Sequence, residues 1–392
     1  MNQVYFDHAA TTPPRPEVIE AMLPYLRERW GNPSSLHKTG TAALEGIERA
    51  REHVAALLNA EPDEIVFTAS GTESDNHALV GVSAGPHRGE HLVTSAIEHH
   101  AVLDTAQALA RQGRRVTYLP VDETGLLDPQ AVRDAIDDAT VLVSVMHANN
   151  EVGTIQPIAE IGAICRERGV LFHTDAVQTA GHVPIDVRAM NVDLLSLSAH
   201  KLYGPKGVGA LFVRKGTRLA PFVHGGGQER RRRAGTENVP GIVGFGEAAR
   251  LARADLEREM RHASALRDRL IAGVLARVPG ATLTGHRTRR LPNSASFCFE
   301  GVEGESVVLD LDLAGFAASS GSACTSGSLE PSHVLLAMGV PHALARGSLR
   351  VTVGRGNTTA EVEVFLDALP RIIERLRAAS PLWSGGTRRG AR

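Results

Sequence analysis

The cysteine at position 324 lies in the segment SSGSACTSGS, which begins at Ser319 and is rich in glycine and hydroxyl side chains. A packed thiol is expected among apolar neighbours, whereas this composition favours exposed, flexible chain. The pattern therefore predicts a nucleophile carried on a loop. Cys165, on an apolar helical face, and Cys298, between two phenylalanines, are instead predicted to be packing residues. The odd total of 3 cysteines, with no close pairing, argues against a disulfide framework.

Two lysines, Lys201 and Lys206, follow a predicted buried strand in SLSAHKLYGPKGVGAL. Partial desolvation at the end of a buried strand lowers the pKa of a lysine and frees its amine for Schiff-base chemistry. An isolated lysine in such a place is more often a surface residue, and spacing alone does not choose between these two.

An acidic residue, Asp175, ends another predicted strand in FHTDAVQTAG, with Gln178 one helical turn further on. In a parallel sheet the ligand crevice lies outside such carboxyl ends. A carboxylate there could pair with the protonated pyridine nitrogen of a cofactor and hold the ring as an electron sink. For Asp175 taken alone, a simple cap of the following helix is an equally good interpretation.

The segment FTASGTESDN predicts an anion site, because Gly71 and Thr72 lie where a strand gives way to a helix. Backbone N–H groups and a hydroxyl converge there, which suits a phosphate ester. Glu73 and Asp75 are also ordinary charges for the first turn of a helix, so plain capping competes with this interpretation.

His99 and His100 in SAIEHHAV could stack on a cofactor ring and relay protons near neutral pH, although a solvated helix start is the simpler alternative. No metal site is predicted, since neither CxxC nor HExxH spacing occurs.

The basic run Arg230–Arg233 lies between glycines in HGGGQERRRRAGTEN. It is either a solvated charge run or a loop that reaches a phosphate or a neighbouring subunit.

The elements that must position these residues alternate between strands and amphipathic helices through the first two thirds of the chain. Apolar runs such as EIVFTAS, TVLVSVM and VDLLSLS are separated by helical segments such as PIAEIGAICRERG. This order is typical of an α/β fold with a mostly parallel, helix-covered sheet. A long helical stretch from near Asn238 then links to a smaller α+β domain containing NSASFCFEG and GSLRVTVGR.

The 392 residues, 43% of them hydrophobic, suffice for two domains with a substantial core. We predict a large domain at 14–255 and a small domain that combines 1–13 with 256–380 and carries the cysteine loop, about 319–332. The tail 381–392, which ends in SGGTRRGAR, is predicted to be disordered.

Charge and patterning argue against several functional classes. The formal net charge of -2 argues against nucleic-acid binding and against a basic membrane binder. No apolar run approaches the length that spans a bilayer, and the start MNQVYFDHAATT lacks a signal-peptide pattern. We therefore expect a protein of the reducing cytoplasm with no nucleic-acid or membrane partner.

Taken together, the motifs resemble those of the cysteine desulfurases of the NifS/IscS type. In chain order they are FDHAATTP, GNPSSLHKTG, FTASGTESDN, EHHAV, MHANNEVGTIQP, HTDAVQTAG, SAHKLYGPKGVG, GGGQERRRRAGTEN and SSGSACTSGSLEPSHVL. Each motif is modest by itself, but all of them in this order, from about Tyr5 to Thr359, are highly specific.

The resemblance implies a fold-type I, pyridoxal 5'-phosphate-dependent homodimer, class V aminotransferase-like, that takes sulfur from L-cysteine and releases L-alanine. Sulfur would pass as a persulfide on Cys324 to an acceptor such as an iron–sulfur scaffold or a sulfur-carrier protein. A Gly/Ser-rich arm can meet both substrate and acceptor, whereas a rigid element cannot. A nearby positive group such as His99 would promote ionisation of the thiol, whose ordinary pKa is about 8.5.

Residue by residue, Lys201 rather than Lys206 matches the Schiff-base lysine, because it follows the family's Ser-x-His triplet. Asp175 matches the partner of the pyridine nitrogen, and His99 matches the stacking, proton-relaying histidine. The other matches are Gly71, Thr72, Ser198 and His200 in the phosphate cup, Gln178 and Asn150 at the ring's 3'-oxygen or its surroundings, Thr236 as a donor from the other subunit, and Asn32 and Arg350 as anchors of the substrate carboxylate.

Departures from the family pattern are small. His8 stands where the family often has asparagine, and the Arg230–Arg233 run is denser than usual. The segment around Cys324 resembles the branch of the family that has a long mobile loop.

The nearest alternatives are a selenocysteine lyase or a small-amino-acid aminotransferase, which would share Lys201 and Asp175 without needing Cys324. A non-catalytic scaffold that binds partners through the loop and tail is the alternative from another class.

Overall fold

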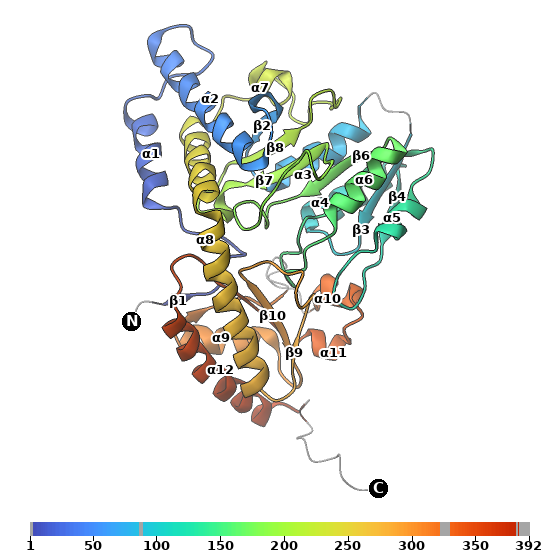
Figure 1. Cartoon of the computed structure of the whole chain (residues 1–392), viewed down its shortest axis with the longest axis vertical. Coiled ribbons are helices and arrows are strands. Elements are labelled where there is room, and N and C mark those ends of the chain that lie inside the picture. The colour runs from blue at the N-terminus through green and yellow to red at the C-terminus, as the bar shows by residue number, and fades with distance from the viewer. Residues whose placement is uncertain (1–2, 86–88, 322–329, 382, 384–392) are drawn as a thin grey trace.

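A computed structural model describes residues 3–85, 89–321, 330–381 and 383. Figure 1 shows a large upper part built on a helix-covered sheet and a smaller lower part, joined by one long helix. Cys324, and the predicted disordered tail except for residues 381 and 383, lie outside the described residues.

The upper part contains a seven-stranded sheet. From one edge to the other its strands are β2 (Ile65–Thr68), β8 (Gly209–Val213), β7 (Leu194–Ser198), β6 (Leu171–Asp175), β5 (Thr140–Ser144), β3 (His91–Ser95) and β4 (Arg115–Leu119). Strand β8 is antiparallel to both of its neighbours, and the remaining neighbours are parallel. The prediction of a mostly parallel sheet is confirmed.

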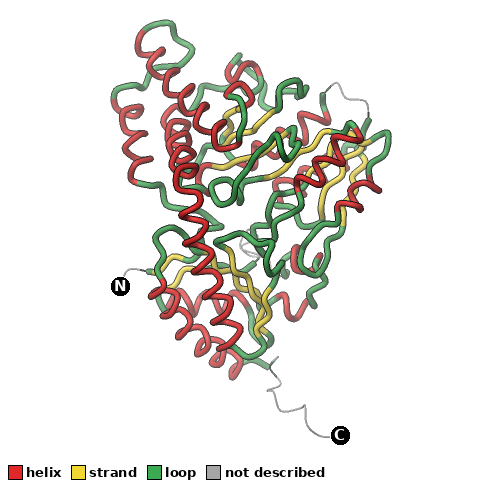
Figure 2. Tube along the Cα trace, viewed as in Figure 1, coloured by secondary structure: helices red, strands yellow, loops and turns green. Residues whose placement is uncertain are grey.

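Helices cover both faces of this sheet, as Figure 2 shows. Successive residues of a strand point to opposite faces, so Leu142 and Leu194 pack with α3 (Gly71–Ser83) and α4 (His100–Arg111), while Val143 and Leu195 face the other core. That second core includes α2 (Lys38–Leu58), α5 (Pro129–Ala135) and α6 (Ile158–Arg168). Burial on both faces explains why these strands are almost continuously apolar.

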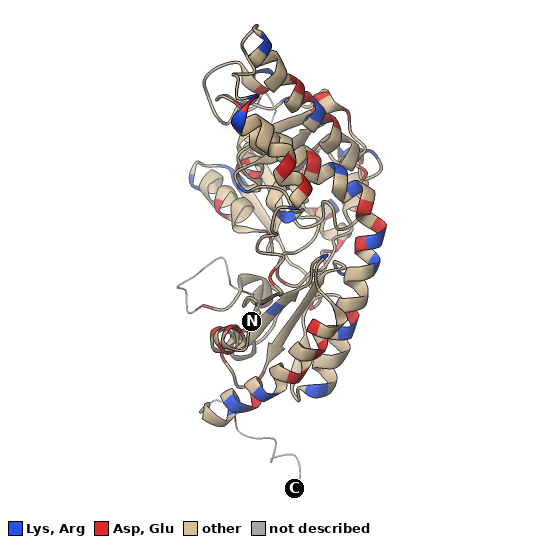
Figure 3. Cartoon of the chain, turned by 90° about the vertical axis from the view of Figure 1, so that its left-hand side faces the viewer, with Lys and Arg blue, Asp and Glu red and all other residues tan. Residues whose placement is uncertain are grey.

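The long helix α8 (Val239–Arg277) connects the two parts. Asn238 caps it, since its side-chain oxygen accepts a hydrogen bond from Gly241 N at 3.1 Å, and the helix predicted from near this residue is confirmed. Buried residues of α8 as far as Ala252 belong to the upper core, and those from Ala263 onward belong to the lower core. The predicted boundary at 255 falls between them, inside a continuous helix. Figure 3 shows charges of both signs along its outer face.

The lower part contains a three-stranded antiparallel sheet with β10 (Ser294–Phe299) between β12 (Ser348–Thr352) and β9 (Ala281–Leu283). Helices α9 (Gly304–Leu313) and α12 (Thr359–Ala379) pack beside it. The N-terminal strand β1 (Val4–Tyr5) pairs in parallel with β11 (Phe316–Ala317), and the Phe6 ring is buried against Phe316 and Phe365. The chain therefore starts in the lower core before it crosses to the upper part.

The remaining elements are short or peripheral. They are α1 (Pro16–Arg27), the 3-10 turns η1 (Pro62–Glu64) and η2 (Ala199–Lys201), α7 (Gln228–Arg231), α10 (His333–Ala337) and α11 (His342–Ala345). Within the described ranges, no helix combines the length and the apolar character needed to cross a bilayer.

Candidate functional site

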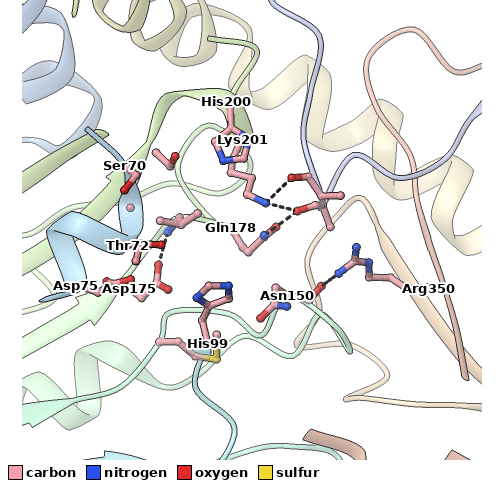
Figure 4. Close-up of a pocket in the computed structure, with 16 residues that line it drawn as sticks. Ser70, Thr72, Asp75, His99, Asn150, Asp175, Gln178, His200, Lys201 and Arg350 are labelled. Carbon is pink, nitrogen blue, oxygen red and sulfur yellow. Dashed lines mark hydrogen bonds between the residues drawn. The ribbon is translucent and has the colours of Figure 1, made fainter. Parts of the chain in front are cut away.

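A cavity of about 290 Å³ lies beyond the carboxyl ends of the central strands, facing the lower part of the molecule. It brings together ten of the residues predicted from the sequence. They are Gly71, Thr72, His99, Asn150, Asp175, Gln178, Ser198, His200, Lys201 and Arg350. Figure 4 labels all of them except Gly71 and Ser198, and they come from segments that are far apart in the chain.

One end of the cavity is formed by the start of α3. Ser70 caps this helix, accepting a hydrogen bond from Glu73 N at 3.1 Å, and Gly71 follows it at the first helical position. A Cβ atom at Gly71 would lie 2.7 Å from Val177 Cγ2 and 3.4 Å from Ser198 Cβ, so a side chain here would require Val177 to shift. A helix N-terminus lined by hydroxyl groups can hold a phosphate.

The Lys201 amine reaches the cavity from the turn after β7. Its Nζ donates hydrogen bonds to the backbone oxygens of Ala9 and Ala10, at 2.5 and 2.8 Å, and Gln178 Nε2 also donates to Ala9 O, at 3.1 Å. The N-terminal segment therefore fixes where the amine lies (Figure 4). Lys206, in contrast, is exposed and does not line this cavity.

Two carboxyl groups, those of Asp175 and Asp75, lie side by side next to Thr72 (Figure 4). Asp175 ends β6 and accepts a hydrogen bond from Val177 N at 2.8 Å. Burial raises the pKa of Asp175 to about 6, although the positive charge of Lys201 acts to lower it. Burial and the neighbouring charge of Asp175 raise the pKa of Asp75 well above its ordinary value. A cation or a protonated ring nitrogen would offset this repulsion.

Asp75 was not predicted as a site residue, because an acidic side chain near the start of a helix has an ordinary explanation as a favourable helix charge. In the structure it is 1% exposed and lines the cavity. The signal that could have revealed it is its spacing: it lies three residues after Thr72, so it shares the helix face with which Thr72 lines the cavity.

His99 caps α4, and its Nδ1 accepts a hydrogen bond from Ala101 N at 3.1 Å. This places the ring proton of the neutral form on Nε2. Burial, with the charge of Lys201, lowers the pKa of His99 to about 4. The ring is therefore neutral near pH 7 and suited to stacking, which does not fit the expectation that it supplies a positive charge to a thiol.

Arg350, on β12, brings a guanidinium from the lower part to the cavity. Its Nη1 donates to Asn150 O at 3.0 Å and its Nη2 donates to Asp7 Oδ1 at 2.9 Å. Its Nε is buried and has no hydrogen-bond partner among the described residues. A fixed guanidinium with unused donors is suited to binding a carboxylate.

Two other predicted site residues lie away from this cavity. Asn32 is exposed in the turn between α1 and α2, where its Oδ1 accepts a hydrogen bond from Ser34 N at 2.9 Å. Thr236, predicted to act on the other subunit, is exposed in the segment before α8. Neither lines the cavity of the chain that carries it.

The basic run before Thr236 is more ordered than its composition suggests. Glu229 is buried and accepts two hydrogen bonds of 2.9 Å from the Arg51 guanidinium. Three successive residues, Glu229, Arg230 and Arg231, have positive φ angles of 44°, 56° and 67°. Arg233 Nε donates to Glu73 Oε1 at 2.8 Å, so this loop is tied to the first turn of α3.

Cys165 and Cys298 are buried free thiols, and burial raises the pKa of each to about 12. Their prediction as packing residues is confirmed.

Three comparisons relate the chain to known proteins. Residues 4–365 match the model of the aminotransferase class-V family. A cysteine desulfurase IscS of Methanosarcina thermophila is 56% identical over 97% of this chain and 94% of its own length. A solved NifS-like protein is 40% identical with a TM-score of 0.90, over 95% of this chain and all (100%) of that one. The solved SspA in complex with cysteine is 38% identical with a TM-score of 0.78, over 91% and 100% of the two chains.

Proposed function

Because this chain belongs to the aminotransferase class-V family and, within it, to the cysteine desulfurases, we propose that it uses pyridoxal 5'-phosphate to move sulfur from L-cysteine to an acceptor. The observation that carries the proposal is the meeting of the Lys201 amine, the Asp175 carboxyl and the N-terminus of α3 in one cavity. The relative solved with cysteine supports L-cysteine as the substrate.

The residues of the cavity fit this cofactor. The start of α3, with Thr72, Ser198 and His200, would hold the phosphate, in the cradle that a side chain at position 71 would fill. Asp175 would pair with the ring nitrogen, and Lys201 would hold the aldehyde carbon. When bound, the cofactor withdraws electrons from Cα of the amino acid and so makes its Cβ–S bond cleavable.

The protein's own groups would bind and orient the substrate. Arg350 offers donors to the carboxylate, and Asn150 O and Asp7 hold its guanidinium in place. In the proposed transfer the substrate's Cβ–S bond breaks and an S–S bond to Cys324 forms. The electron pair stays on carbon, which takes up a proton, so a thiol and L-cysteine become a persulfide and L-alanine without an external oxidant. A thiol of an acceptor protein would then take the sulfur.

The direct test is turnover of L-cysteine by the purified, cofactor-loaded protein in the presence of a reducing thiol. Equal amounts of alanine and sulfide are expected. Pyruvate and ammonia in place of alanine, or no reaction with L-cysteine at all, would contradict the proposal.

Gly71→Ala is expected to weaken cofactor binding by roughly tenfold to a hundredfold, because overpacking of this kind typically costs about 1–3 kcal/mol. The added Cβ would lie 2.7 Å from Val177 Cγ2 and would push the phosphate cradle open. Cofactor affinity, measured from the absorbance of the bound form during equilibrium titration, checks this. Gly356→Ala is the control, since no atom lies within 4 Å of its added Cβ. Equal affinities of both variants would contradict the cradle.

We further propose a homodimer in which a second copy supplies Asn32 and Thr236 to the cavity. Both residues are exposed, and neither lines the cavity of its own chain. Large apolar side chains flank Asn32 on both sides, with Trp30 71% and Leu36 100% exposed. Such side chains at one turn are typical of an interaction surface.

Trp30→Asp is expected to weaken self-association by roughly thirtyfold or more, the effect of losing an aromatic hot spot worth about 2 kcal/mol. Sedimentation velocity over a concentration series measures this. Leu313→Asp is the matched control, because Leu313 is 85% exposed on α9 in the lower part. A Trp30 variant that stays as dimeric as the control would place the interface elsewhere.

A further inference from the structure

Glu151 is a buried carboxyl group that the proposed chemistry does not use. It follows Asn150 in the turn after β5 and is 6% exposed. Its backbone N–H donates to Asn149 Oδ1 at 2.9 Å, which fixes the turn. Burial raises the pKa of Glu151 to about 7, although Ser332 and the charge of Arg350 act in the opposite direction. A buried carboxyl of this kind needs a structural or functional reason.

The Glu151 carboxyl lies against both ends of the segment that contains Cys324. Ser332, on the C-terminal side of that segment, donates a hydrogen bond to Glu151 Oε2. On the N-terminal side, a Cβ atom at Gly321 would lie only 3.1 Å from the same oxygen and 3.6 Å from Ser332 Cβ. Gly321 and Ser332 therefore both lie against the Glu151 side chain.

The same region carries the predicted anchor of the substrate carboxylate. Arg350 N donates to Ser319 O at 2.7 Å, and Gly321 N donates to Ser348 Oγ at 3.2 Å. Strand β12 therefore holds the chain that enters the segment. Because Arg350 Nη1 also donates to Asn150 O, the residue before Glu151, the anchor and both ends of the segment form one hydrogen-bonded unit.

We propose that Glu151 is a positioning residue for sulfur transfer, which sets both ends of the Cys324 segment relative to the substrate anchor Arg350. The inference rests on the proposed function. Glu151 does not touch the reacting atoms; it acts through Ser332 and the close approach of Gly321. The carboxyl is required because it accepts a hydrogen bond from the Ser332 hydroxyl and also interacts with the charge of Arg350.

Two variants test this, Glu151→Gln, which preserves shape, and Ser332→Ala, which removes the hydroxyl from the opposite side. Single-turnover transfer of radiolabelled sulfur from L-cysteine onto the holoenzyme is expected to slow by about tenfold or more in each. Affinity for L-alanine, read from the absorbance of the bound cofactor, is expected to change less than twofold. In the double variant the two losses should not add, because Glu151→Gln removes the charge and Ser332→Ala removes the hydroxyl of the same contact.

The controls are Glu64→Gln, another buried carboxyl, and Thr284→Ala, another buried hydroxyl, which donates to Ser296 Oγ at 2.7 Å. Both are expected to transfer sulfur at the rate of the unaltered protein. Sulfur transfer within twofold of that rate in Ser332→Ala, or a loss of L-alanine affinity as large as the loss of transfer, would overturn the inference. Failure of the unaltered protein to take up label would instead contradict the proposed function itself.

Discussion

Lys201→Ala is expected to lower alanine formation from L-cysteine by a factor on the order of a thousand or more, because the amine is both the predicted attachment point and a proton carrier. Borohydride reduction of the unaltered holoenzyme should leave a stable pyridoxyl group on one peptide, and mass spectrometry should place it on Lys201. The amine already faces the cavity, held by the backbone oxygens of Ala9 and Ala10.

Lys206→Ala is the matched control for this variant. Lys206 lies five residues further along the same segment and is exposed, outside the cavity. It should retain both turnover and the label. A pyridoxyl label on Lys206, or none on Lys201, would refute the assignment of the amine.

Cys324→Ser is expected to reduce sulfur transfer by a factor on the order of a hundred or more while leaving cofactor content and the label on Lys201 unchanged. A hydroxyl cannot accept the substrate sulfur as a persulfide. The measurements are alanine release and protein-bound sulfur after a single turnover. Turnover that is indifferent to this change would instead fit an aminotransferase, which needs no such thiol.

Cys165→Ala provides the comparison for the cysteine variant. The Cys165 thiol is buried, and its raised pKa keeps it protonated, so it is unsuited to nucleophilic attack. Sulfur transfer should therefore survive this substitution even if stability falls. If Cys165→Ala lost sulfur transfer while as much of it was folded as of the unaltered protein, Cys165 rather than Cys324 would be the residue that accepts the sulfur.

Local sequence patterns account for the part of the site formed by strand ends, whereas Arg350 and the choice of Lys201 over Lys206 came from the family resemblance. Gly71, Asp175 and Lys201 each follow a run of apolar residues, and in a parallel sheet such ends meet at one edge. Local pattern and topology therefore suffice to bring them together. The same patterns predicted the sheet and the long helix.

What the patterns missed depends on contacts that residue type does not encode. The backbone oxygens of Ala9 and Ala10 fix the Lys201 amine, and a backbone oxygen is present at every residue. Asp75 has an ordinary local explanation as a helix charge, and only packing shows its burial. Glu151 and Ser332 are 181 positions apart, so no local spacing relates them.

The 39-residue rod of α8, roughly 58 Å long, is shared by both cores without a break. Domains that swing about a hinge need a flexible joint, and here the boundary lies within continuous helix. Rotation of one half against the other would have to bend that rod. Because residues of both halves line the cavity, a change in its width by such a rotation would require α8 to bend.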